Sequence, residues 1–116
     1  MATTIWHNPR CSKSRATLAL LEDRNLDVNV VIYLDDPPGA ELLAGVLDEL
    51  GMEPRELMRR KETPYTTLNL GAPDLDRDAL IRAMVENPVL IERPVVIHEG
   101  RVAVGRPPEN VLTILG

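Results

Sequence analysis

The sequence predicts an α/β fold: a four-stranded mixed sheet with flanking helices and a helical insertion after the second strand. Two short strand patterns enclose an amphipathic helix at the start, and a stretch of helical patterns follows. Two further strand patterns and a last helical segment end the chain. At 116 residues the chain has the commonest size of one domain, so we expect a single domain over residues 1–116.

The first third of the chain is expected to form a strand, a helix and a second strand. Residues 2–6 are short and β-branched, and a His-Asn-Pro sequence interrupts them. A helix is predicted from about residue 12 to residue 23, capped by Cys11 or Ser12. Its expected apolar stripe is Ala16, Leu18, Ala19, Leu20 and Leu21. Residues 28–34 form the second buried strand.

This order has a consequence for the loop that follows the first strand. Two parallel strands joined by a helix almost always adopt a right-handed crossover. The crossover places the loop that holds Cys11 at the carboxyl end of the first strand, where open α/β sheets bind their ligands.

The middle of the chain is expected to be helical. Residues 39–50 are amphipathic and end at Gly51, a residue suited to a left-handed cap. A short helix begins at Pro54, residues 65–70 form one turn or two, and residues 76–86 form a longer helix.

The last part of the chain is expected to return to the sheet. Residues 95–104 read as two short strands about a Glu-Gly turn, which is typical of a hairpin. Residues 107–115 form a closing helix.

Composition excludes several classes of function. The formal charge of −5 argues against a nucleic-acid partner or an anionic membrane, which both require a basic face. No run of about 18 apolar residues is present, and the first residues lack the pattern of a signal peptide. We therefore expect a cytoplasmic protein with no nucleic-acid or membrane partner.

Cys11 is the single cysteine of the chain, and it is either buried filler or a chemical group. It has no partner for an internal disulfide, and with only two histidines a zinc site is not expected. A helix start favours an anion, and Arg10, Lys13 and Arg15 add positive charge nearby, so the pattern favours a reactive thiolate.

The same helix start can also bind an oxyanion, because its free N–H groups point to one spot. Two neighbouring residues are left with alternatives. Ser14 is either a solvent-facing residue of the first turn or a donor to the sulfur. His7 is either a solvated residue at the end of the strand or a cation that lowers the pKa of the cysteine.

Four segments resemble one family, and together they span nearly the whole chain. They are residues 7–15 (HNPRCSKSR), 57–65 (LMRRKETPY), 87–96 (NPVLIERPVV) and 104–109 (VGRPPE). The chain resembles the glutaredoxin-coupled arsenate reductases, which have a thioredoxin-like fold with a helical insertion. The Ser-Lys pair after the cysteine, where many members carry Gly-Thr, is similar to a Cys-Ser-Lys-Ser branch of that family.

The resemblance implies roles for particular residues. Cys11 would be the catalytic nucleophile, assisted by His7 and Ser14, and three arginines would bind the oxyanion. By motif position these are Arg59, Arg93 and Arg106, with Arg59 chosen over Arg60 because it lies five residues before the Pro of the Pro-Tyr pair. The proline that follows Arg93, Pro94, is expected to form a cis peptide bond.

The resemblance also implies a reaction. Cys11 would attack arsenate or a similar oxyanion, glutathione would attack the adduct as co-substrate, and glutaredoxin would resolve the mixed species. No bound cofactor and no metal are implied. Two alternatives remain: a thiol oxidoreductase of the same fold that acts on another substrate, and a binding module related to redox-responsive transcription regulators.

Overall fold

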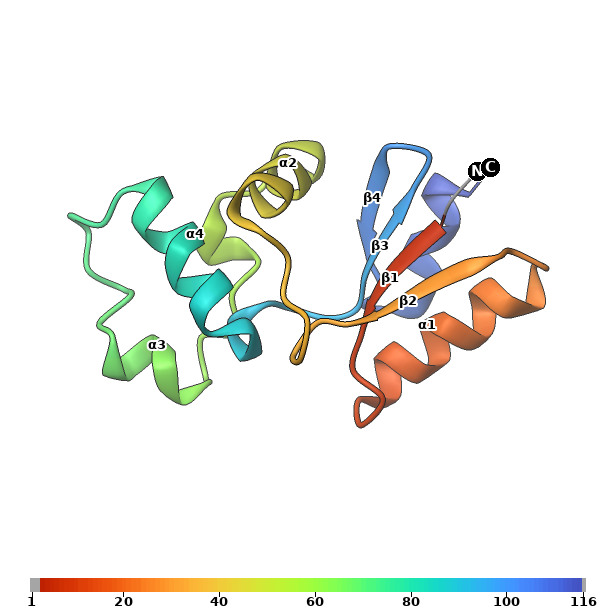
Figure 1. The fold of residues 1–116 in the computed structure, drawn as a ribbon, viewed down its shortest axis with the longest axis horizontal. Helices are drawn as coiled ribbons and strands as arrows, with labels where there is room; N and C mark the ends of the chain where they lie inside the picture. The colour runs from red at the N-terminus through yellow and green to blue at the C-terminus, as the bar shows by residue number, and fades with distance from the viewer. Residues whose placement is uncertain (1–2, 116) are drawn as a thin grey trace. The chain divides into compact units, whose positions relative to one another are not determined.

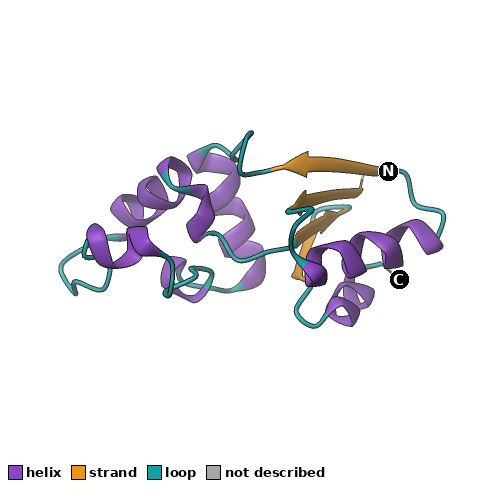
Figure 2. Cartoon of the chain, turned by 90° about the horizontal axis from the view of Figure 1, so that it is seen from below, coloured by secondary structure: helices purple, strands orange, loops and turns teal. Residues whose placement is uncertain are grey.

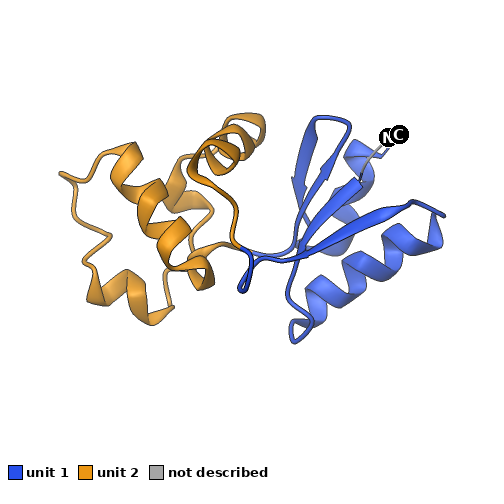
Figure 3. Cartoon of the chain, in the orientation of Figure 1, with its two compact units in different colours: residues 1–36, 93–116 blue, residues 37–92 orange. Residues whose placement is uncertain are grey.

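The computed structural model describes residues 3–115, so residue 2 of the first expected strand lies outside the described residues. The chain divides into two compact units (Figure 3). One consists of residues 1–36 and 93–116 and the other of residues 37–92, and each is described by itself.

The first unit is built on a four-stranded mixed sheet with the order β2-β1-β3-β4 (Figure 1). Its strands are β1 (Thr3–His7), β2 (Val28–Ile32), β3 (Val95–His98) and β4 (Arg101–Val104). β1 pairs in parallel with β2 and antiparallel with β3, and β3 pairs antiparallel with β4. The predicted four-stranded mixed sheet is therefore confirmed.

Two helical segments cover one face of this sheet, α1 (Ser12–Asp23) and η3 (Pro108–Ile114) (Figure 2). A shared core joins them to the strands, made of Ile5, Leu21, Val96, Ala103, Val111 and Ile114. Because the strands are short and the helices pack on their apolar side, the loops at one end of the sheet are held in fixed positions.

The buried face of α1 differs from the predicted stripe. Ser14, Thr17 and Leu21 are its buried residues, whereas Ala16 and Ala19 are exposed. Ser14, Thr17 and Leu21 are three and four residues apart, which places their side chains on one face of the helix. Two hydroxyl groups thus lie where aliphatic side chains were expected, and a count of apolar residues could not identify that face.

The ends of the early elements follow local chemistry. α1 ends where Asn25 adopts a left-handed conformation at φ 59°. β2 ends at Ile32, two residues before the predicted end, because the N–H groups of Asp35 and Asp36 both donate to the Ile32 carbonyl and turn the chain.

The β3–β4 hairpin forms at the predicted Glu-Gly turn. Glu99 and Gly100 both have positive φ, at 50° and 81°. Two consecutive positive φ values are typical of a type I′ turn, whose twist matches that of antiparallel strands.

The second unit is helical, as predicted for the insertion after the second strand. It contains α2 (Ala40–Leu50), η1 (Pro54–Glu56), α3 (Thr63–Thr67), α4 (Arg77–Glu86) and η2 (Pro88–Leu90). Gly51 ends α2 in the predicted left-handed conformation at φ 66°. The ambiguous segment 65–70 contains only the end of α3, which begins at Thr63 because Pro64 suits a first helical turn.

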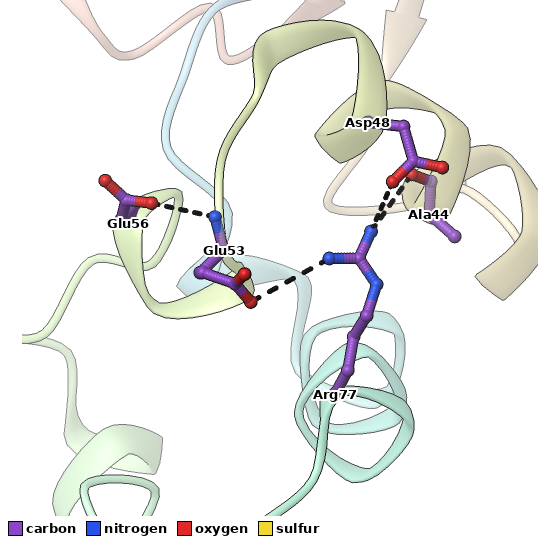
Figure 4. Close-up of polar contacts among 5 residues, drawn as sticks. All are labelled: Ala44, Asp48, Glu53, Glu56 and Arg77. Carbon is purple, nitrogen blue, oxygen red and sulfur yellow. Dashed lines mark hydrogen bonds and ion pairs between the residues drawn. The ribbon is translucent and has the colours of Figure 1, made fainter.

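α2 and α4 pack against each other, and Arg77 joins them on their polar side (Figure 4). Its Nη2 donates to Asp48 Oδ1 at 2.8 Å and lies 3.4 Å from the Ala44 carbonyl, both on α2. Its Nη1 lies 3.9 Å from a carboxylate oxygen of Glu53.

Within residues 3–115, no helix combines the length and apolar character needed to cross a bilayer.

Candidate active site

Cys11 lies at the start of α1, at the end of the loop that follows β1. It is the N-cap of the helix and has extended backbone angles, with φ −96° and ψ 123°. Its N–H donates to the Asn8 carbonyl at 3.0 Å, and its carbonyl accepts from the Arg15 N–H at 3.0 Å. The thiol is partly exposed. The sulfur therefore stands at the positive end of the helix with access to solvent.

The surroundings of the sulfur lower the pKa of Cys11. Burial alone raises this pKa, but hydrogen bonds from the Ser14 N–H, the Arg93 side chain and the Lys13 N–H outweigh it, and the charge of Arg93 adds to them. A thiol whose folded pKa lies below its unfolded value stabilises the fold fully above the unfolded pKa, and this stabilisation is lost as the pH falls through the folded pKa.

The source of the positive charge differs from the sequence-based expectation. The Arg10, Lys13 and Arg15 side chains are exposed, and Arg15 donates to the Pro9 carbonyl at 2.9 Å. Of these three residues only Lys13 acts on the sulfur, through its backbone N–H. The expectation that nearby basic side chains hold the thiolate is therefore wrong, because those side chains point to solvent.

Two of the predicted arginines meet at the sulfur. Nη1 of Arg106 lies 3.8 Å from Cys11 Sγ and 3.2 Å from the carbonyl oxygen of Arg93. Both arginines precede a cis peptide bond, to Pro94 and to Pro107. The cis bond at Pro94 is the predicted one, whereas nothing in the sequence had indicated the second. Three segments far apart in the sequence thus converge on one atom.

His7 and Ser14 form a buried pair behind the cysteine loop. His7 Nδ1 lies 2.6 Å from Ser14 Oγ, and the Asn8 N–H donates to the same oxygen at 3.0 Å. Ser14 is 0% exposed and His7 is 5% exposed. The alternatives that placed these side chains in solvent are therefore wrong. The Ser14 hydroxyl is used by its two partners, and the backbone N–H of this residue is the group that donates to the sulfur.

The pKa of His7 is lowered, first by burial and second by the charge of Arg15, against an opposing effect of Glu22. This shift disfavours the imidazolium form. It argues against the hypothesis that a protonated His7 holds the thiolate, which stays a prediction. His7 acts on the cysteine loop through its hydrogen bond to Ser14.

Arg59 and Arg60 lie in the second unit. The Arg59 N–H donates to the Leu90 carbonyl at 2.7 Å, and Nε lies 3.4 Å from a Glu62 carboxylate oxygen. Nη1 of Arg59 is buried and has no hydrogen-bond partner within the described part of the chain. Arg60 is exposed and donates to the Arg55 carbonyl at 3.3 Å. Arg59 is thus the arginine of the pair with a buried donor that has no partner among the described residues.

Two residues of this region were missed from the sequence. Thr17 and Gly105 are both buried and lie next to each other, 88 positions apart in the sequence. The available signals were a hydroxyl three residues after Ser14 and a glycine immediately before Arg106.

Among residues 3–115, no group of three or more His, Cys, Asp or Glu side chains is arranged to hold a metal ion.

Comparison with known proteins gives a consistent result. A model of the ArsC family matches residues 6–114. YfgD of Escherichia coli K12 is 53% identical over 97% of this chain and 95% of its own length. The arsenate reductase of Neisseria meningitidis serogroup A is 50% identical over 96% of both chains. The solved structure of the arsenate reductase from Vibrio cholerae is 51% identical, covers 99% of this chain and 98% of its own, and superposes with a TM-score of 0.95.

The lowered pKa of Cys11 predicts a shifted pH profile of alkylation. The rate with iodoacetamide is expected to reach half its maximum below about pH 8.5, the value of an unperturbed thiol. Rates measured from pH 5 to 10 on the native and the urea-unfolded chain check this, because the unfolded chain serves as its own reference. Coincident midpoints for the two states would contradict the prediction.

Ser14→Ala is expected to destabilise the fold by about 1–3 kcal/mol, because it leaves the Asn8 N–H and His7 Nδ1 without their shared partner. The matched control is Ser12→Ala, since Ser12 lies in the same helical turn but is exposed. Its effect should stay within about 0.5 kcal/mol. The free energy of unfolding of both variants is measured with urea. Equal losses in the two variants would show that the buried pair contributes nothing to stability.

Proposed function

The chain belongs to the ArsC family, and we propose that it is an arsenate reductase in which the Cys11 thiolate attacks the oxyanion. The observation that carries the proposal is the meeting of Arg93 and Arg106 at a thiol whose pKa is lowered. An arginine fork offers planar, permanently charged donors, which suit the oxygens of a tetrahedral anion. The names of the relatives from Neisseria meningitidis and Vibrio cholerae support the choice of arsenate.

The first step is nucleophilic substitution at arsenic. The sulfur of Cys11 forms a bond to As(V), and one arsenic oxygen takes up protons and leaves as water. Arg93 and Arg106 balance the negative charge of the oxygens that remain. The helix N–H groups of Lys13 and Ser14, which hold the sulfur as an anion before attack, make the thiolate available at neutral pH.

Reduction requires two electrons from thiols outside the chain, because Cys11 is its single cysteine. We propose glutathione as the thiol that attacks the adduct and glutaredoxin as the protein that resolves the mixed species, in the cytoplasm. When a thiol attacks a sulfur bound to arsenic, an S–S bond forms and the electron pair of the broken S–As bond stays on arsenic. The complete cycle converts one arsenate and two thiols into one arsenite, one disulfide and one water, with no bound cofactor.

We also propose a role in oxyanion binding for Arg59, a residue of the second unit. Its assignment rests on motif position and on the buried Nη1 that lacks a partner within the described residues. A guanidinium with spare donor capacity is suited to receive an anion, since an unpaired buried donor is costly to the fold.

The proposed activity is tested with arsenate, glutathione, glutaredoxin, glutathione reductase and NADPH. With the wild-type chain, oxidation of NADPH by glutathione reductase is expected only when arsenate is present. Cys11→Ser should abolish this arsenate-dependent oxidation, because the serine oxygen cannot replace the nucleophilic sulfur. Omission of glutaredoxin tests its role. The role of glutathione is tested by direct measurement of arsenite, because the NADPH signal itself requires glutathione. A wild-type chain that shows no arsenate-dependent oxidation would disprove the proposal.

Arg59→Ala is expected to lower kcat/KM for arsenate by about tenfold or more, because a lost charge-assisted hydrogen bond is worth about 1.5–3 kcal/mol. Arg60→Ala is the matched control, since Arg60 is exposed and its contacts go to a local carbonyl. It should keep near-normal kinetics. Circular dichroism verifies that both variants fold, and an equal effect of the two substitutions would remove Arg59 from the site.

A further inference from the structure

Gly105 lies in a space that no side chain could share. A Cβ atom at this position would lie 2.5 Å from Thr17 Oγ1, 2.8 Å from Pro94 Cγ and 3.0 Å from Thr17 Cγ2. Contacts of this length are shorter than van der Waals distance, so the neighbours would have to move. Gly105 has no positive φ, unlike Gly51 and Gly100. Lack of space, not backbone conformation, is therefore what requires glycine here.

The atoms that close over Gly105 belong to the other two segments of the candidate active site, those of Thr17 and Pro94. The Thr17 hydroxyl donates to the Lys13 carbonyl at 2.8 Å, within the first turns of α1, and lies 3.4 Å from the Gly105 carbonyl. The Gly105 N–H donates to the Pro94 carbonyl at 2.9 Å. This junction is fully internal, since Thr17, Pro94 and Gly105 are all buried.

Each segment carries one functional group immediately beside the junction. Lys13 supplies a backbone N–H to the sulfur, Arg93 precedes Pro94, and Arg106 follows Gly105. A displacement at the junction is therefore passed along one peptide unit to each arginine. The distance from Arg106 Nη1 to Cys11 Sγ is already 3.8 Å, so a shift of a few tenths of an ångström away from the sulfur would end the interaction.

We propose that Gly105 is a positioning residue: its missing side chain lets Thr17 and Pro94 close over it, and this contact sets where the two arginines stand at the sulfur. The proposal deepens the proposed function, because it concerns the same site, but its test does not depend on arsenate. The charged groups that face the thiol across the junction are Arg93 and Arg106, while His7, whose pKa is lowered by burial, acts behind the loop.

The test compares Gly105→Ala with the wild-type chain by iodoacetamide alkylation of Cys11 at pH 6 and pH 9.5. At pH 6 the variant is expected to react about threefold to tenfold more slowly, because weaker donation from Arg93 raises the pKa of the thiol and lowers the thiolate fraction. At pH 9.5 both thiols are ionised, and the rates should agree within about twofold.

The matched control is Gly45→Ala, because a Cβ at Gly45 meets no atom within 4 Å. This variant should have the wild-type rate at both pH values. A second variant, Thr17→Ala/Gly105→Ala, removes two of the three short contacts and is expected to recover part of the rate at pH 6. Thermal unfolding of each variant accompanies the measurement, because an unfolded fraction would itself lower the rate at pH 6; only variants that are fully folded at the assay temperature are compared.

The rates at the two pH values distinguish displaced arginines from other effects of the substitution. A folded Gly105→Ala with the wild-type ratio of rates overturns the proposal, and so does a deficit of equal size at both pH values, which would show lost access rather than displaced arginines. If Gly105→Ala does not fold, the double variant is compared with Thr17→Ala. The two differ only in the Cβ at position 105, which still meets Pro94 in the double variant. Equal alkylation rates of these two variants at pH 6 would therefore overturn the proposal. Arsenate turnover of the wild-type chain is measured separately, so failure of the proposed function leaves this test intact.

Discussion

The hydrogen bond between the Ser14 hydroxyl and His7 Nδ1 is the constraint on which the candidate active site depends. It joins the first turn of α1 to the end of β1 at 2.6 Å, inside the protein, and the Asn8 N–H completes the cluster. The other attachments of the cysteine loop are its own backbone turn and the exposed Arg15 side chain, which donates to the Pro9 carbonyl. With the hydrogen bond between Ser14 and His7, the N–H groups of the helix start point to one place, and the sulfur of Cys11 occupies that place.

The chemistry of the sulfur follows from opposing effects on the pKa of the thiol. Partial burial disfavours the thiolate, and donors from α1 and from Arg93 more than compensate. Because Arg93 and Arg106 reach the sulfur from outside the helix, the same two side chains can turn to the oxygens of an incoming anion. In the proposed function, one set of groups thus both holds the nucleophile and binds the substrate.

The sequence predicted much of the fold, because its signals were local. The hairpin turn at Glu99 and Gly100, the cap at Gly51 and the alternation of strands and helices each depend on a few adjacent residues. The buried face of α1 was predicted only in part. Leu18, Leu20 and Leu21 pack on the core as expected, whereas Ser14 and Thr17 are buried through partners 7 and 88 positions away. The positive charge at the sulfur was assigned to Arg10, Lys13 and Arg15, because these residues are close to Cys11 in the sequence. Only the folded chain shows that those side chains point outward and that Arg93 takes their place.

One feature of α1 links its backbone directly to the state of the sulfur. Cys11 is the N-cap of the helix but has no side-chain oxygen to accept the free N–H groups; the Lys13 and Ser14 N–H groups act instead on its sulfur and lower the pKa of the thiol. The thiolate is therefore itself the cap. Any change at the sulfur, such as protonation, alkylation or formation of a mixed disulfide, alters the acceptor of these two amides. Their proton chemical shifts and exchange rates would consequently report each covalent state of the cysteine in a single spectrum, without a label on the reacting atom.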